Sequence, residues 1–126
     1  MAWVLMHWVV SGARYAGYRR YLACASRREN PTPWLHRYYL GAATAGLVWS
    51  ATGTVLYPTS SLPDQGVIGF VMAGITAVGL VNMGPLHMAY RLFVITFLGT
   101  VAAYKFWLGG PIETKLGLLS LVFGTI

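Results

Sequence analysis

The sequence predicts an all-α fold: a polytopic bundle of transmembrane helices with four spans and a short fifth segment. Hydrophobic residues make up 56% of the 126 residues, and the mean hydropathy is +0.58. Charged residues make up only 10%, whereas soluble domains contain roughly a quarter. A water-soluble fold of this size would lack the polar groups to cover its surface. We therefore interpret residues 1–126 as a single transmembrane domain.

The basic residues indicate how the chain is oriented in the membrane. The formal net charge is +6. The arginines that fall between the first two apolar stretches are Arg14, Arg19, Arg20, Arg27, Arg28 and Arg37. Cytoplasmic loops carry such an excess of basic residues, so this loop is predicted to be cytoplasmic and the N-terminus to lie outside. A nucleic-acid-binding protein would instead spread its charge over a polar surface, so we expect no nucleic-acid partner.

The first predicted span covers residues 2–25 and ends in an aromatic and basic half, RYAGYRRYLACA. Arginine and tyrosine at this density suit the lipid headgroup zone. The apolar half alone is shorter than the ~20 residues needed to cross a bilayer. We expect the helix to continue into the cytoplasm and to end near Pro31, because proline disfavours helix at the preceding residue. Thr32 is expected to cap the next helix.

The second span is predicted at 39–57 and the third at 65–83, on either side of a proline-containing turn on the outer side. Both spans are long enough to cross a bilayer, and both carry small residues at four-residue spacing on one helix face. These small residues are Ala42, Gly46 and Ser50 in the second span, and Gly69, Ala73 and Ala77 in the third. Because small residues let helix backbones approach closely, we predict that these two helices form a tight packing pair.

The fourth span is predicted at 88–107, after a cytoplasmic turn. Arg91, one turn inside this span, is expected to snorkel to the headgroups or to pair with Glu29, and Lys105 to snorkel at the outer interface. The last apolar segment, 114–126, is too short to cross a hydrocarbon core of ~30 Å. We expect it to be a re-entrant or interfacial piece, or a span that the end of the chain interrupts.

The sequence offers little for catalysis or metal binding. With three acidic residues and three histidines, it has no carboxylate pair, no metal-ligand spacing and no phosphate-binding loop. We predict no enzymatic activity, metal or cofactor. The candidate ligand-binding residues are Trp49, Asn82 and His87, although core packing of Trp49 and an interfacial amide at Asn82 are simpler alternatives. His7 lies in an apolar stretch, where an ionisable group is a functional candidate, but a neutral interfacial histidine explains it as well.

Several motifs together carry a resemblance to a known family. The segment YRRYLACASRRENP ends the first helix, and Trp34 and Arg37 follow in a W-x-x-R pattern. Gly41, Gly46 and Trp49 then form a G-x-x-x-x-G-x-x-W run, and the third span reads FVMAGITAVGLVNMGP. This part of the chain resembles the N-terminal multi-helix sensor regions of bacterial histidine kinases and GGDEF diguanylate cyclases.

The resemblance implies a signal-input domain of a two-component or similar system in the bacterial inner membrane. Such regions look like six-helix bundles, so this chain would start at the second helix and stop inside the sixth, without the output module. The implied partners are the lipid bilayer and either a cytoplasmic kinase or cyclase module or a second copy of the chain. Two alternatives remain: a small non-catalytic membrane subunit or scaffold, and a transporter fragment with a helix broken at Gly84-Pro85.

Overall fold

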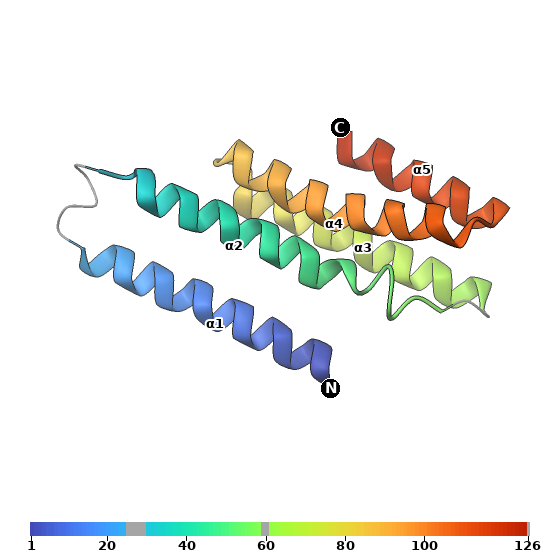
Figure 1. Cartoon of the computed structure of the whole chain (residues 1–126), viewed down its shortest axis with the longest axis horizontal. Helices are drawn as coiled ribbons and strands as arrows, with labels where there is room; N and C mark the ends of the chain where they lie inside the picture. The colour runs from blue at the N-terminus through green and yellow to red at the C-terminus, as the bar shows by residue number, and fades with distance from the viewer. Residues whose placement is uncertain (25–29, 59–60, 126) are drawn as a thin grey trace.

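The computed structural model describes residues 1–24, 30–58 and 61–125, and within them the chain forms five helices and no strand. The helices are α1 (Ala2–Ala23), α2 (Thr32–Ser50), α3 (Leu62–Met83), α4 (His87–Leu108) and α5 (Pro111–Thr125). All five lie along the long axis of the molecule, with α1 on one side and α5 on the other (Figure 1). The all-α prediction is therefore confirmed for the part of the chain that the structure describes.

Local backbone chemistry sets several helix boundaries. Thr32 was expected to cap α2, but the N-cap residue is Pro31 and no side chain caps the helix. The reason is that Pro31 already has helical dihedral angles, so Thr32 is the first residue of the helix and not its cap. At the start of α3 the Ser61 hydroxyl oxygen accepts a hydrogen bond from the Asp64 backbone N–H at 3.5 Å. The end of α4 is marked by Gly109, whose φ of 71° is readily adopted only by glycine.

The second helix begins and ends earlier than the predicted span 39–57, because hydrogen-bonded turns replace helix after Ser50. The Thr52 hydroxyl donates to the Trp49 carbonyl at 2.7 Å, and the Thr54 hydroxyl donates to the Ser50 carbonyl at 3.0 Å. Hydroxyl side chains of this kind compete with the helical hydrogen-bonding pattern. The chain consequently leaves the helix several residues before Tyr57.

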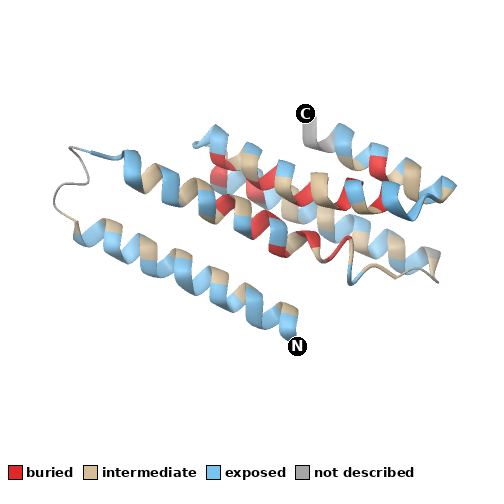
Figure 2. Cartoon of the chain, viewed as in Figure 1, coloured by how far each residue is buried: buried red, intermediate tan, exposed pale blue. Residues whose placement is uncertain are grey.

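The core lies between α2 and α4, which share the most extensive helix–helix contact (Figure 2). Phe93, Phe97 and Val101 of α4 are buried against Ala42 and Ala45 of α2. Large side chains therefore come from α4, whereas α2 contributes small ones that let the two backbones approach closely.

The predicted tight pairing of the second and third helices is wrong, because α2 packs against α4 and α3 contacts α4 less extensively. The small residues of α2, at 42, 46 and 50, are buried, as expected of a packing face. The corresponding residues of α3, which are Gly69, Ala73 and Ala77, are exposed. Their face points away from the other helices because α3 contacts α4 through Gly79, which lies against the Phe93 ring.

The two outer helices are attached differently. No residue of α1 is buried, and its link to α2 includes a hydrogen bond of 3.0 Å from the Trp3 indole N–H to the Val48 carbonyl. By contrast, α5 packs extensively on α4, where Gly117 lies against the Phe106 ring. The C-terminal segment predicted at 114–126 is thus the larger part of a helix that starts at Pro111.

Two of the described helices are long and apolar enough to cross a membrane: Pro63–Met83, with a mean hydropathy of 1.9, and His87–Leu108, with a mean hydropathy of 1.3. In α3 only 11% of the most apolar stretch is buried, compared with 39% in α4. The apolar side chains that α3 exposes are Val67, Phe70, Val71, Val78, Leu80 and Val81. Much of the exposed surface of α3 is therefore hydrophobic.

Candidate functional site

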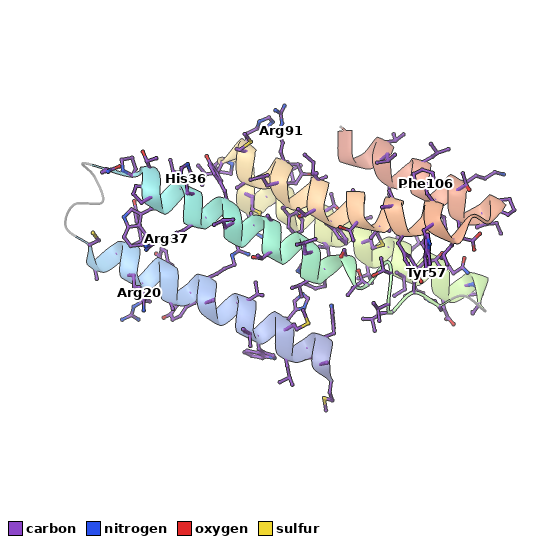
Figure 3. The ribbon with its side chains drawn as sticks, in the orientation of Figure 1. Arg20, His36, Arg37, Tyr57, Arg91 and Phe106 are labelled. Carbon is purple, nitrogen blue, oxygen red and sulfur yellow. The ribbon has the colours of Figure 1, made fainter. Side chains whose placement is uncertain are left out.

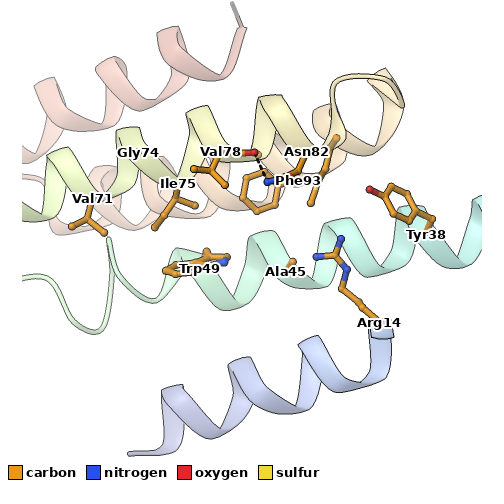
Figure 4. Close-up of a pocket in the computed structure, with 12 residues that line it drawn as sticks. Arg14, Tyr38, Ala45, Trp49, Val71, Gly74, Ile75, Val78, Asn82 and Phe93 are labelled. Carbon is orange, nitrogen blue, oxygen red and sulfur yellow. Dashed lines mark hydrogen bonds between the residues drawn. The ribbon is translucent and has the colours of Figure 1, made fainter. Parts of the chain in front are cut away.

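A groove of about 790 Å³ runs between α2 and α3 (Figure 4). It is a partly open groove and not an enclosed cavity. Phe93 of α4 contributes to its wall, and Arg14 reaches it from α1. The residues that line the groove are Arg14, Tyr38, Ala45, Trp49, Val71, Gly74, Ile75, Val78, Gly79, Asn82, Met83 and Phe93.

The polar side chains of the groove gather at one of its ends (Figure 4). Arg14 extends from α1 across Gly41, where a Cβ atom would lie 3.4 Å from the Arg14 side chain. The guanidinium carbon is 5.8 Å from the centre of the Tyr38 ring, within the range of a cation–π contact. The Asn82 amide N–H donates to the Val78 carbonyl at 2.9 Å, which uses one of its two N–H groups. Among the residues that the structure describes, no acidic side chain lines the groove beside Arg14.

The opposite end of the groove is apolar and is backed by an aromatic cluster of Trp3, His7 and Trp49. The His7 and Trp49 rings meet edge to face with their centres 4.2 Å apart, and the Trp3 ring lies 5.5 Å from that of Trp49. The His7 Nε2 atom is buried without a hydrogen-bond partner among the described residues. The Trp49 side chain thus has two roles, as the wall of the groove and as the surface on which α1 packs.

The structure brings two of the three predicted ligand-binding residues together. Trp49 of α2 and Asn82 of α3 line different parts of the same groove. His87 is exposed at the first position of α4 and does not line the groove. It directly follows the turn between α3 and α4.

Sequence reasoning missed Arg14 because the segment RYAGYRRYLACA was assigned to the headgroup zone, and it missed Tyr38 because the second span was predicted to begin after it. A signal was present in the spacing of α1. Trp3, His7 and Arg14 follow one another at intervals that place them on one helix face, and all three belong to the half-buried side of a helix whose other residues are mostly exposed. The same face of α1 therefore carries the aromatic cluster and the arginine of the groove.

A second polar cluster lies where α4 ends, and it corrects the expectation that Lys105 snorkels into the headgroups. Lys105 is only 2% exposed, and its Nζ atom lies 2.8 Å from the centre of the Tyr57 ring. Nζ has no hydrogen-bond partner among the described residues. Burial raises the pKa of the Tyr57 phenol, and the Glu113 carboxylate raises it further, so the ring over Lys105 is a neutral phenol. The lysine is covered because the turns after α2 place Tyr57 over the last turn of α4 (Figure 3).

At the other end of α4, Arg91 is exposed and points away from the bundle, as expected of a snorkelling side chain (Figure 3). Its alternative partner, Glu29, lies outside the described residues. His36 at the start of α2 is also exposed. These residues contribute polar groups to the same end of the bundle without forming a pocket with the groove residues.

Comparison with known proteins finds no matching family model, no similar curated protein and no similar solved structure. The function is therefore inferred from the residues and contacts of the groove. One cation, one phenol and one amide meet an apolar wall there, and such a combination suits the binding of a molecule that has both a polar and an apolar part.

Proposed function

We propose that the chain is a membrane-embedded signal-input domain in which a ligand in the groove changes how α3 packs on the other helices. The observation that carries this proposal is that the two walls of the groove are held unequally. The α2 wall is fixed to α4, where Gly46 meets Thr96 and the Phe93 backbone. The α3 wall has few contacts and little buried surface. A ligand that touches both walls would favour one position of α3 over another.

The proposal places α1 to α4 across the membrane as four spans, with α5 as a partial fifth. The exposed apolar side of α3 supports a lipid environment, since Phe70 and Val81 are 83% and 79% exposed. Contiguous apolar surface of this kind is unfavourable in water and suits hydrocarbon. The arginine-rich loop would be cytoplasmic and the N-terminus outside, in the inner membrane of a bacterium.

The output partner would be a cytoplasmic kinase or cyclase module, or a second copy of the chain. A movement of α3 would reach the cytoplasmic side at the turn that connects it to α4. His87, the first residue of α4 after this turn, is exposed, so it is better placed to contact a cytoplasmic partner than to bind the groove ligand. The chain itself would perform no catalysis.

Two other functions are compatible with a helical bundle. A scaffold subunit would need only the α2–α4 core and a single arrangement of helices. A transporter would need an interrupted helix at the ligand site. Gly84 and Pro85 do not form one, because they lie in the turn between α3 and α4.

The test is whether α3 has two positions. Spin labels would be attached by cysteine at Leu47 of α2 and Val81 of α3, both exposed, in a Cys24→Ala chain in lipid nanodiscs. A matched pair at Leu47 and Ile95 would report the fixed α2–α4 distance. We expect two α2–α3 distance populations and one α2–α4 population. A single α2–α3 distance, as narrow as the α2–α4 distance, would contradict the proposal and favour a scaffold.

A further inference from the structure

We propose that the groove binds one anionic glycerophospholipid, with its phosphate at Arg14 and one acyl chain along the wall of α3. This inference rests on the proposed function, since it names the class of ligand for the same site. It follows from the charge, the polarity gradient and the position of the groove.

The charge of the groove selects an anion. Among the described residues that line the groove, Arg14 carries the only formal charge, and no carboxylate among them pairs with it. A guanidinium forms strong, often bidentate hydrogen bonds with phosphate. The Tyr38 phenol and the Asn82 amide are further hydrogen-bond donors at the same end. A zwitterionic lipid would place its own ammonium group close to this guanidinium, so a lipid with net negative charge is preferred.

The polarity gradient of the groove matches an amphiphile. The three polar residues lie at one end, and Trp49 and Val71 lie at the other, as Figure 4 shows. Ile75 and Val78 line the wall of α3 between these ends. An acyl chain placed along them would cover part of the apolar surface that α3 leaves exposed. A small hydrophilic anion would leave this part of the groove without a partner.

The position of Arg14 favours a lipid over a soluble anion. Its side chain lies beside Tyr38 and Gly41, where the sequence of α2 changes from basic and aromatic to uncharged and apolar. This change marks the boundary between headgroups and hydrocarbon. Asn82 lies near the C-terminal end of α3, at the same end of the groove. A phospholipid of the adjacent leaflet has its phosphate at this depth without leaving the membrane.

The inference is tested with the full chain in phosphatidylcholine vesicles. A small fraction of the lipid is replaced by phosphatidylglycerol with dibrominated acyl chains, which quench tryptophan fluorescence on contact. In a control sample the same fraction of dibrominated phosphatidylcholine is used, and its quenching of tryptophan fluorescence measures nonspecific contact with lipid. We expect stronger quenching by the brominated phosphatidylglycerol. The excess should disappear in Trp49→Phe, because Trp49 is the tryptophan that lines the groove.

Two pairs of variants assign the preference to the groove. Arg14→Gln should weaken the preference for phosphatidylglycerol about tenfold, since it removes a charge-assisted hydrogen-bonded pair. Arg19→Gln is the matched control, with the same change at an exposed position of α1. Gly74→Leu should also weaken the preference, because a side chain at this lining position would enter open space in the groove. Gly69→Leu is the matched control and should leave the preference unchanged, because Gly69 is an exposed glycine of α3 that does not line the groove.

Equal quenching by the two brominated lipids, or equal effects of the two arginine variants, would overturn the inference. Excess quenching by dibromostearic acid without any by the brominated phosphatidylglycerol, or displacement by millimolar inorganic phosphate, would also overturn it. Lipid binding with a single α3 position would leave the inference standing and remove the signal-input function. Two α3 positions without any preference for phosphatidylglycerol would leave the signal-input function standing and remove the lipid inference.

Discussion

Gly46 of α2 and Thr96 of α4 are in direct contact, because the Thr96 hydroxyl occupies the space into which a side chain at position 46 would point. The same hydroxyl lies 3.1 Å from the Ala43 carbonyl of α2 and 2.8 Å from the Leu92 carbonyl of its own helix. A threonine that bonds across two helices at a glycine is a common way to hold helices together in a membrane. This contact fixes one wall of the groove.

Gly46→Leu should therefore destabilise the chain. The new side chain would collide with Thr96 and with the Phe93 backbone, which cannot move without separating α2 from α4. We expect a loss of about 1–3 kcal/mol in the free energy of unfolding, measured as a lower thermal unfolding temperature in detergent. Gly69→Leu is the control, since nothing lies within 4 Å of a Cβ atom there. Equal unfolding temperatures for the two variants would show that the α2 face does not pack as described.

Trp3→Phe should loosen α1 without affecting the core. The change removes the hydrogen bond to the Val48 carbonyl and keeps an aromatic ring next to Trp49. We expect a local loss of about 0.5–1.5 kcal/mol, seen as faster amide hydrogen exchange in α1 and unchanged exchange in α4. Trp8→Phe on the same helix is the control, because Trp8 is 74% exposed. Faster exchange in α4 as well would indicate that α1 is part of the core.

Lys105→Met should leave the chain equally stable or make it more stable. Burying an ammonium group costs several kcal/mol, whereas a desolvated cation–π contact contributes about 2 kcal/mol. Lys105 is 2% exposed and Nζ has no hydrogen-bond partner among the described residues, so the cost is the larger of the two. Unfolding in detergent at neutral pH would measure the change, with the exposed Lys115→Met as control. A clear loss of stability in Lys105→Met alone would mean that the contact with Tyr57 outweighs desolvation.

Gly79→Leu should displace α3 and leave the α2–α4 pair in place. A Cβ atom at Gly79 would lie 2.9 Å from the Phe93 ring, which is buried in the core. We expect a longer distance between spin labels on α3 and α4, with no change between labels on α2 and α4. If both distances changed, α3 would be an integral part of the core, and the unequal anchoring of the groove walls would be refuted.

The sequence predicts the helices well because prolines and glycines mark their ends. Pro31 and Gly109 are the cap residues of α2 and α4, and Pro63 lies in the first turn of α3. The end of α2 is the exception, since the hydroxyls of Thr52 and Thr54 replace helix by turns inside an apolar stretch. Hydropathy is insensitive to such hydrogen bonds.

The choice of helix partners could not be predicted from one sequence. The stripes around Gly46 and Gly69 have the same spacing, and either allows close approach, but only Gly46 meets another helix. The decisive feature is the complementary surface of α4, where Phe93 and Thr96 surround Gly46. Likewise, Lys105 carries no sequence signal of burial, because the ring that covers it is contributed by Tyr57, a residue distant in the chain.

The candidate site was predicted in part. Trp49 and Asn82 were chosen as unusual residues within apolar spans, and both line the groove. Arg14 and Tyr38 were missed because composition identifies a headgroup zone but does not show which arginine turns inwards. Arg14 can turn towards the groove because the glycine at position 41 leaves room for the aliphatic part of its side chain to lie against α2.

The pairing of α2 with α4 also constrains how the protein is made. Thr96 and its partner Ala43 are separated by 53 residues, and a ribosome adds roughly 5–20 residues per second. Hence several seconds pass between the synthesis of the small-residue face of α2 and the synthesis of the α4 residues that cover it. During this interval the small-residue face of α2 has no partner helix to pack against.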